Sequence, residues 1–286
     1  MASLSTNDQD GVLFVVSTPI GNLGDITVRA IDILRSVDLI ACEDTRRSRV
    51  LLQRWDITSE LMSLHRFSEK RKSQTILDRL KRGGKIALIS DAGTPAVSDP
   101  GHRLVRIALE AGIRVSPIPG PSSITAALSA SGIDCSSFVY LGFVPRKNDA
   151  RRSFFHSLLL EDRTSIFFET PRRICVTLRI ATQVLGAKPM VFFRELTKVH
   201  EEILFGSAGD ILKILESRDT IKGEIIVVVE GGIEKTPAID SDKAVKNLLK
   251  EGFSGKRLAD EACKRFGVKK GEAYAKFLEI KNDKKG

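Results

Sequence analysis

The sequence predicts an α/β protein that contains two α/β units and a small helical unit at its C-terminal end. Over residues 12–132, short apolar stretches alternate with helical segments, which favours a mainly parallel sheet covered on both faces. Over residues 133–232, neighbouring apolar stretches are joined by short links, which favours a mixed, partly antiparallel sheet. Residues 233–286 contain a polar linker and a Lys-rich helical tail, whereas residues 1–11 are expected to be a disordered leader.

The first unit is expected to contain five strands with helices between and after them. The expected strands span residues 12–17, 38–41, 61–64, 86–89 and 113–118. The expected helices span residues 27–35 and 68–82, a segment that begins near His102, and an Ala/Ser-rich segment that ends near Ser131. Most of the expected strands are short, uninterrupted apolar runs, a pattern typical of strands buried on both faces.

The same apolar and helical patterns predict the strands and helices of the second unit and of the tail. The expected strands span residues 138–143, 164–168, 189–193, 200–206 and 224–229, and the expected helices span residues 171–185 and 208–215. The linker is expected at residues 234–242. The tail, residues 243–281, should form three helices broken at Gly252 and Gly267, in the manner of a helix-turn-helix bundle.

Composition narrows the class of protein. The chain has 286 residues, with 45 Lys and Arg against 36 Asp and Glu, so its formal charge is +9. This charge suits an anionic partner such as nucleic acid, although it could also serve solubility alone. The four Cys residues form no metal-binding spacing and predict reduced thiols without a metal site. The chain shows neither a membrane-spanning run nor a signal-peptide core, which predicts a cytoplasmic protein, or an organellar stroma or matrix protein whose transit segment was removed.

The loop at residues 90–101 is the first candidate for a ligand site. It follows the apolar run 86–89, and ligands of open α/β sheets bind beyond the carboxyl ends of such strands. Gly93 would let a ligand approach the backbone, and Asp91 could accept a hydrogen bond from an amine or a ribose hydroxyl. The alternative is an ordinary strand-to-helix turn capped by Asp99. The length of the loop and its two Asp residues favour the site.

No dinucleotide or phosphate-loop fingerprint is present, so several strand-end loops would have to combine. Four motifs in order are VSTPIGNLGD at residues 16–25, EDTR at 43–46, SDAGTP at 90–95 and PGPS at 119–122. FETP at residues 168–171 and RELTK at 194–198 follow. In this order the motifs resemble the tetrapyrrole-methylase-like superfamily of S-adenosylmethionine-dependent methyltransferases. Within it, they look like the ribosomal RNA small-subunit methyltransferase I family, and the resemblance covers nearly all of the chain after residue 11.

The resemblance implies two α/β domains of the tetrapyrrole-methylase type, with S-adenosylmethionine in the cleft between them. It implies methylation of a cytidine ribose 2′-hydroxyl in small-subunit rRNA, within the small ribosomal subunit, by a homodimer. Asp91 and Glu169 could take the cofactor's amine or ribose hydroxyls, and Phe168 could supply an apolar wall. The residues assigned to the cofactor by the matching motifs, together with the start of the last strand, are Pro19, Ser90, Asp91, Gly93, Thr94, Ser122, Ser123, Phe168, Glu169, Gly223 and Glu224.

A ribose hydroxyl is a poor nucleophile, so the reaction gains from a base. Glu195 and Asp44 are the candidates, with His65 behind them. Glu195 could instead form a salt bridge with Arg194 or Lys198, and Asp44 could instead cap the helix that begins at Thr45. The family usually carries His where this chain has Arg172, and its usual HxHNE pattern is here HRFSE at residues 65–69, which weakens a histidine base.

Basic residues near the motifs could contact phosphate, or could form a solvated face. They are Arg46, Arg47, Arg172, Arg173 and Lys198. The tail could hold rRNA or buttress the dimer, and Phe138, Tyr140 and Phe143 could join a dimer surface. Two other functions stay open: a methylase acting on a small tetrapyrrole, and a non-enzymatic RNA-binding protein that keeps the fold.

Overall fold

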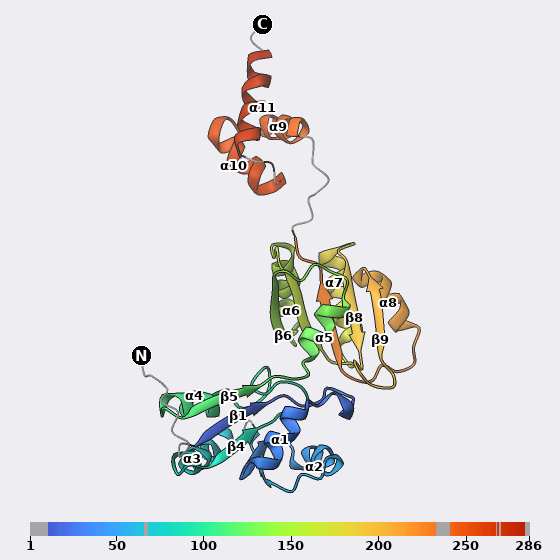
Figure 1. Ribbon diagram of the computed structural model, residues 1–286. Helices are drawn as coiled ribbons and strands as arrows, with labels where there is room; N and C mark the ends of the chain where they lie inside the picture. The colour runs from blue at the N-terminus through green and yellow to red at the C-terminus, as the bar shows by residue number, and fades with distance from the viewer. Residues whose placement is uncertain (1–10, 66–67, 233–240, 267, 269, 284–286) are drawn as a thin grey trace.

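The computed structural model describes residues 11–65, 68–232, 241–266, 268 and 270–283. The described chain forms two five-stranded sheets, one built from residues 12–118 and the other from residues 138–229, and a C-terminal group of three helices. Figure 1 shows the two sheet units stacked on one another, with the helical group beyond the second unit. The predicted α/β class and its C-terminal helices are confirmed.

The first sheet has the strand order β3-β2-β4-β1-β5. Its strands are β1 (Val12–Val16), β2 (Leu39–Cys42), β3 (Glu60–Ser63), β4 (Lys85–Leu88) and β5 (Arg114–Ile118). All pairings in this sheet are parallel, as the alternation of strands and helices predicts. The carboxyl ends of the strands therefore meet at one edge, and their loops can build a site together.

Helices cover both faces of the first sheet. One face packs against α1 (Val28–Ser36) and α2 (Thr45–Arg54), and the other packs against α3 (Glu69–Lys81) and α4 (His102–Glu110). Glu69, at the start of α3, is buried and accepts hydrogen bonds from the backbone N–H groups of Gly101 and Arg103, at 3.0 and 3.2 Å. These N–H groups belong to the start of α4, so a carboxylate of α3 caps that helix and fixes the end of the 90–101 loop.

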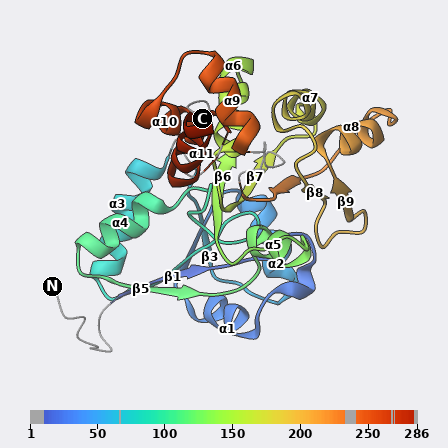
Figure 2. The same ribbon diagram turned by 90° about the horizontal axis from the view of Figure 1, so that it is seen from above.

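The second sheet has the order β6-β7-β10-β8-β9. Its strands are β6 (Phe138–Phe143), β7 (Thr164–Glu169), β8 (Met190–Arg194), β9 (Glu202–Gly206) and β10 (Ile225–Val229). β6 and β7 are parallel and the other pairs are antiparallel, so the predicted mixed sheet is confirmed. One face packs against α6 (Asn148–Leu159), α7 (Ile174–Leu185) and α8 (Ala208–Glu216), and α5 (Ser123–Ala130) lies on the other, as Figure 2 shows.

Helix α6 is not among the elements predicted from the sequence. Its apolar face, which includes Phe155 and Leu158, is interrupted by Arg151, and the helical period is hard to see for that reason. Arg151 is nevertheless buried, because its guanidinium donates to the side-chain oxygen of Asn148 and to the backbone oxygen of Arg146. Both terminal nitrogens of the guanidinium thus keep hydrogen-bond partners at a core position, whereas the buried Nε has none.

The C-terminal helices are α9 (Ser241–Lys250), α10 (Gly255–Phe266) and α11 (Lys270–Asp283). They share a core of their own, in which Val245, Leu248 and Leu258 pack with Phe277. Most of the predicted leader and of the predicted linker lies outside the described residues, as does the break at Gly267. Within the described part of the chain, no helix is both long and apolar enough to cross a membrane.

Candidate active site

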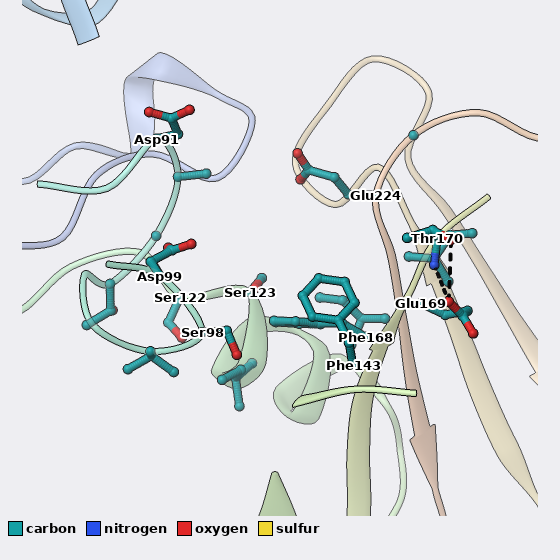
Figure 3. A pocket seen from close by; sticks show the side chains of 18 of the residues that line it. Asp91, Ser98, Asp99, Ser122, Ser123, Phe143, Phe168, Glu169, Thr170 and Glu224 are labelled. Atoms are coloured by element: carbon teal, nitrogen blue, oxygen red, sulfur yellow. Dashed lines mark hydrogen bonds between the residues drawn. The ribbon is translucent and has the colours of Figure 1, made fainter. Parts of the chain in front are cut away.

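A cavity of about 450 Å³ lies where the loops of the two sheet units face one another. Loops that follow β4 and β7, the start of α5 and the start of β10 surround it (Figure 3). Nine of the eleven residues predicted for the cofactor line it, namely Asp91, Gly93, Thr94, Ser122, Ser123, Phe168, Glu169, Gly223 and Glu224. The cavity is also lined by residues that the motifs did not assign to the cofactor, namely Glu43, Val97, Ser98, Asp99, Ile124, Phe143, Thr170 and Pro171.

Pro19 and Ser90, the other two predicted residues, are buried and lie outside the cavity lining. Ser90, and Thr18 next to Pro19, support the 90–101 loop. Thr18 and Gly93 exchange two backbone hydrogen bonds of 2.9 and 3.0 Å, and the Ser90 hydroxyl donates to the backbone oxygen of Gly93 at 3.1 Å. Gly93 has a φ of 77°, a left-handed conformation that favours glycine, so this residue fixes the path of the loop along the cavity wall.

Aromatic rings form the apolar side of the cavity. Phe168 makes edge-on contacts with Tyr140 and Phe143, with ring centroids 5.2 and 5.4 Å apart. The Tyr140 hydroxyl shares a 2.5 Å hydrogen bond with Ser98, which ties β6 to the loop of the first unit. Phe143 is exposed and lines the cavity, so it has a place in the candidate site. Its part in a dimer surface stays a prediction.

Glu169 does not present its carboxylate to the cavity, contrary to the role expected for it. Its side chain is fully buried and forms an ion pair of 2.5 Å with Arg173. It also accepts hydrogen bonds from the Thr170 N–H and the Thr177 hydroxyl, both at 2.6 Å. Figure 3 shows the carboxylate turned away from the cavity. Arg173 also donates to Val144 and Thr170, so this pair holds the end of β7 in place and leaves Arg173 poorly suited to phosphate.

Glu195 lies beside the cavity without lining it. Its carboxylate forms an ion pair with Lys198 at 2.8 Å and accepts the Glu224 N–H at 2.9 Å. Burial raises the pKa of Glu195, but the bonds from Lys198 and Glu224 outweigh burial and leave the pKa below its usual value. The salt bridge considered as the alternative is therefore present, and Lys198 also reaches Glu224 at 3.3 Å. Both observations argue against Glu195 as a base and against Lys198 as a free phosphate contact.

A second hollow of about 470 Å³ adjoins the cavity. It is lined by Glu43, Asp44, Thr45, Arg46, Arg47, Ser63, His65 and Asp91, so Glu43, Arg47 and Asp91 belong to both spaces. Asp44 caps α2 by accepting the backbone N–H of Arg46, as the alternative predicted. The hydrogen bonds from Arg46 lower the pKa of Asp44 to about 2, which makes Asp44 a weak base.

Asp99 does not take the capping role that was the alternative for the 90–101 loop. It does not cap α4, whose first turn follows Gly101, and it faces the cavity instead (Figure 3). Burial raises the pKa of Asp99 to about 6, and the nearby carboxylates of Glu43 and Asp91 add to the shift. The second Asp of the loop is visible in the sequence, but the sequence does not show that other carboxylates lie close to it. Among the described residues, no cluster of His, Cys, Asp and Glu could hold a metal ion.

Comparison with known proteins agrees with this architecture. Residues 12–212 match the family of tetrapyrrole (corrin/porphyrin) methylases. Two solved structures, a cobalt precorrin-4 methyltransferase and a diphthine synthase, superpose with TM-scores of 0.58 each, at 16% and 17% identity. They cover 79% and 77% of this chain and 98% and 90% of their own, so they share its fold.

Closer relatives carry a more specific name. "Ribosomal RNA small subunit methyltransferase I" of Escherichia coli O157:H7 is 42% identical over 96% of this chain and 97% of its own length. The protein of that name from Thermotoga maritima is 43% identical over 77% of this chain and 99% of its own length. The chain therefore belongs to the ribosomal RNA small subunit methyltransferase I family, a branch of the tetrapyrrole methylases that uses S-adenosylmethionine.

Proposed function

We propose that the chain methylates the ribose 2′-hydroxyl of a cytidine in small-subunit rRNA. The observation that carries the proposal is the pair of adjoining spaces, one aromatic and acidic and the other rimmed by arginines, which share a wall. The first suits a small cationic cofactor, whereas the second suits a nucleotide and its phosphates. The relatives' name supplies the RNA substrate, and the cytidine ribose is the acceptor that the sequence motifs imply.

The cavity fits S-adenosylmethionine in size and in chemistry. Its volume falls within the 300–1,000 Å³ range typical of small-molecule sites. Phe168 and Phe143 offer an apolar surface for a flat ring, and Ser122 and Ser123 offer hydroxyl groups at the start of α5. Asp91 belongs to the cavity lining, and its carboxylate is an acceptor for an ammonium group or a ribose hydroxyl. When bound, the cofactor supplies an electrophilic methyl group on a sulfonium.

Asp99 is the proton acceptor in this proposal. A base is most effective when its pKa lies near the working pH, and the pKa of Asp99 is raised to about 6. Asp44 and Glu195, the carboxylates considered first, have lowered pKa values and are held by Arg46 and Lys198. Asp99 would therefore accept the proton of the ribose hydroxyl, while the loop at 90–101 and the cap from Glu69 hold it at the cavity.

The RNA contacts are proposed at the second hollow and on the tail. Arg46, Arg47 and Arg172 are exposed and can reach phosphate, in contrast to Arg173 and Lys198. On the tail, the exposed basic residues that the structure describes are Lys246, Lys250, Lys256, Arg257, Lys270 and Lys281. Lys243 and Lys269 are further basic residues of the tail, and their side chains lie outside the described set.

The protein acts as a homodimer in the cytoplasm in this proposal. The second sheet leaves apolar side chains of its edge strand β9 exposed, namely Ile203 and Phe205, and Val199 precedes them. Phe138, on the opposite edge strand, is also exposed. Large exposed apolar groups of this kind mark association surfaces. Light scattering at micromolar protein should give twice the chain mass, and the mass of a single chain would refute the dimer.

Transfer of a radioactive methyl group tests the function. Tritiated S-adenosylmethionine is incubated with the protein and either unmethylated small ribosomal subunits or uroporphyrinogen. Label in the rRNA of the subunits supports the proposal, whereas label in the porphyrinogen assigns the activity to a small tetrapyrrole. Titration calorimetry with S-adenosylmethionine is run beside it. A protein that binds RNA, binds no cofactor and labels neither acceptor would be the non-enzymatic relative.

A further inference from the structure

We propose that Arg47 couples the binding of cofactor to the binding of RNA, so that each ligand strengthens the other. The inference rests on the proposed function, because it takes cofactor in the aromatic cavity and RNA phosphate at the second hollow. Its structural basis is that Arg47 is paired with Asp91, a residue of the cofactor cavity lining.

The ion pair stands at the boundary of the two spaces. Nη1 of Arg47 lies 3.3 Å from Oδ2 of Asp91, and both residues line both spaces. The other oxygen of Asp91 accepts the backbone N–H of Asp44 at 3.0 Å, which fixes the carboxylate relative to α2. The side chain of Arg47 is 71% exposed, whereas that of Asp91 is 19% exposed. Asp91 is therefore held in place, and Arg47 is the partner that can leave.

Each ligand competes for one half of this pair. The cofactor carries an ammonium and a sulfonium, and a positive group near Asp91 weakens its hold on Arg47. An RNA phosphate competes with Asp91 for the Arg47 guanidinium, and Arg47, as the exposed partner, turns its planar fork to the phosphate and away from Asp91 to form a bidentate pair. The pair must therefore be broken for either ligand, but it needs to be broken only once when both bind. Thermodynamic linkage makes the resulting coupling equal in both directions.

Arg46 provides a matched control. It is the neighbouring arginine on α2, its side chain is 88% exposed, and it pairs with Asp44 at 2.7 Å. Arg46 and Asp44 line the second hollow but not the cofactor cavity. A phosphate that draws Arg46 from Asp44 therefore breaks no contact that the cofactor also breaks. Arg46→Gln should weaken RNA binding and leave the coupling intact.

The experiment measures both affinities in the presence and absence of the other ligand. The affinity for S-adenosylhomocysteine, which keeps the ammonium and transfers no methyl group, is measured by calorimetry with and without saturating unmethylated small-subunit rRNA. The affinity for the rRNA is measured by filter binding with and without S-adenosylhomocysteine. We expect each ligand to raise the other's affinity by the same factor, about two- to fivefold, the range for an exposed ion pair.

Two variants decide the assignment to Arg47. In Arg47→Gln the factor should fall to near one, whereas in Arg46→Gln it should stay at the parental value while rRNA affinity drops. Equal affinities with and without the second ligand in the parent protein, or an unchanged factor in Arg47→Gln, would overturn the coupling while both ligands still bind. If the parent protein fails to bind one of the ligands, the proposed function itself is wrong and the coupling falls with it.

Discussion

Replacing Asp99 with Asn removes the proposed proton acceptor and keeps the size of the side chain. A positioned base typically contributes about 10²–10⁴-fold to a rate, so the variant should lose methyl transfer by a factor in that range. The parent protein should also show a pH dependence, because a base acts only when it is ionised. With a pKa raised to about 6, the rate should fall as pH drops through 6 and level off above 7.

The assay is a single-turnover transfer to small subunits from pH 5 to pH 8, with cofactor affinity measured separately by calorimetry. Asp44→Asn is the matched control, because Asp44 lines the adjoining hollow and its pKa of about 2 should leave no titration in this range. An Asp99→Asn variant that keeps more than a tenth of the parental rate at saturating cofactor, or a parental rate that is flat from pH 5 to pH 8, would refute the assignment.

The raised pKa of Asp99 also predicts a cost in stability. Burial makes the ionised form less favourable in the folded protein than in the unfolded chain, whose pKa is near 3.8. The contribution of the group to the free energy of unfolding is therefore highest below pH 3.8 and declines as pH rises to about 6. Asp99→Asn should consequently raise the urea midpoint at pH 7.5 and change it little near pH 4. A lower midpoint at pH 7.5 would contradict this.

Three further changes test other parts of the structure. Asp91→Asn, which keeps an acceptor for the Asp44 N–H, should weaken cofactor binding by about 1.5–3 kcal/mol, and unchanged affinity in calorimetry would remove Asp91 from the site. Thr177→Val removes a hydrogen bond to the buried Glu169 carboxylate and should lower the free energy of unfolding by about 1.5–3 kcal/mol in urea. Thr182→Val on the same helix is its control and should lose about 1 kcal/mol or less, because Thr182 donates only to a neutral backbone oxygen; equal losses would contradict the role of Glu169. Deleting the chain after Gly232 should reduce methylation of subunits and leave cofactor affinity unchanged. It should also flatten the slope of log RNA affinity against log salt concentration, which is about −0.7 for each phosphate contacted on a single strand. If the truncated protein keeps the parental rate and slope, the tail does not anchor RNA. If it loses cofactor binding, the tail packs against the rest of the protein and supports the cofactor site.

The order of strands and helices could be predicted because apolar runs of four to six residues alternate with amphipathic segments. The position of the loops that surround the cavity could also be predicted, because the carboxyl ends of parallel strands meet at one edge of the sheet. Most of the residues assigned to the cofactor by motif do lie there. The sequence therefore predicts where the site lies, because it predicts the strands and loops that form it.

The direction in which each carboxylate points could not be predicted. Glu169 and Arg173 are four residues apart near the start of α7, and only the packing of β7 shows that they face inward and satisfy one another. Glu195 has a φ of 53° in the turn after β8, and its carboxylate also accepts the N–H of Glu224, a contact between distant parts of the chain. The environment of Asp99 could not be predicted, because burial is the main cause of its raised pKa and two of the carboxylates that add to the shift, Glu43 and Glu224, lie outside its loop.

Alkaline hydrolysis of the methylated rRNA tests the central claim most directly. A methyl group on a ribose 2′-oxygen removes the nucleophile that cleaves the next phosphodiester bond, whereas a methyl group on a base leaves that hydroxyl free. Small subunits labelled by the protein with tritiated S-adenosylmethionine should therefore yield the label in an alkali-resistant dinucleotide that begins with cytidine. Recovery of the label in mononucleotides, or in a resistant dinucleotide that begins with another base, would contradict the proposed reaction.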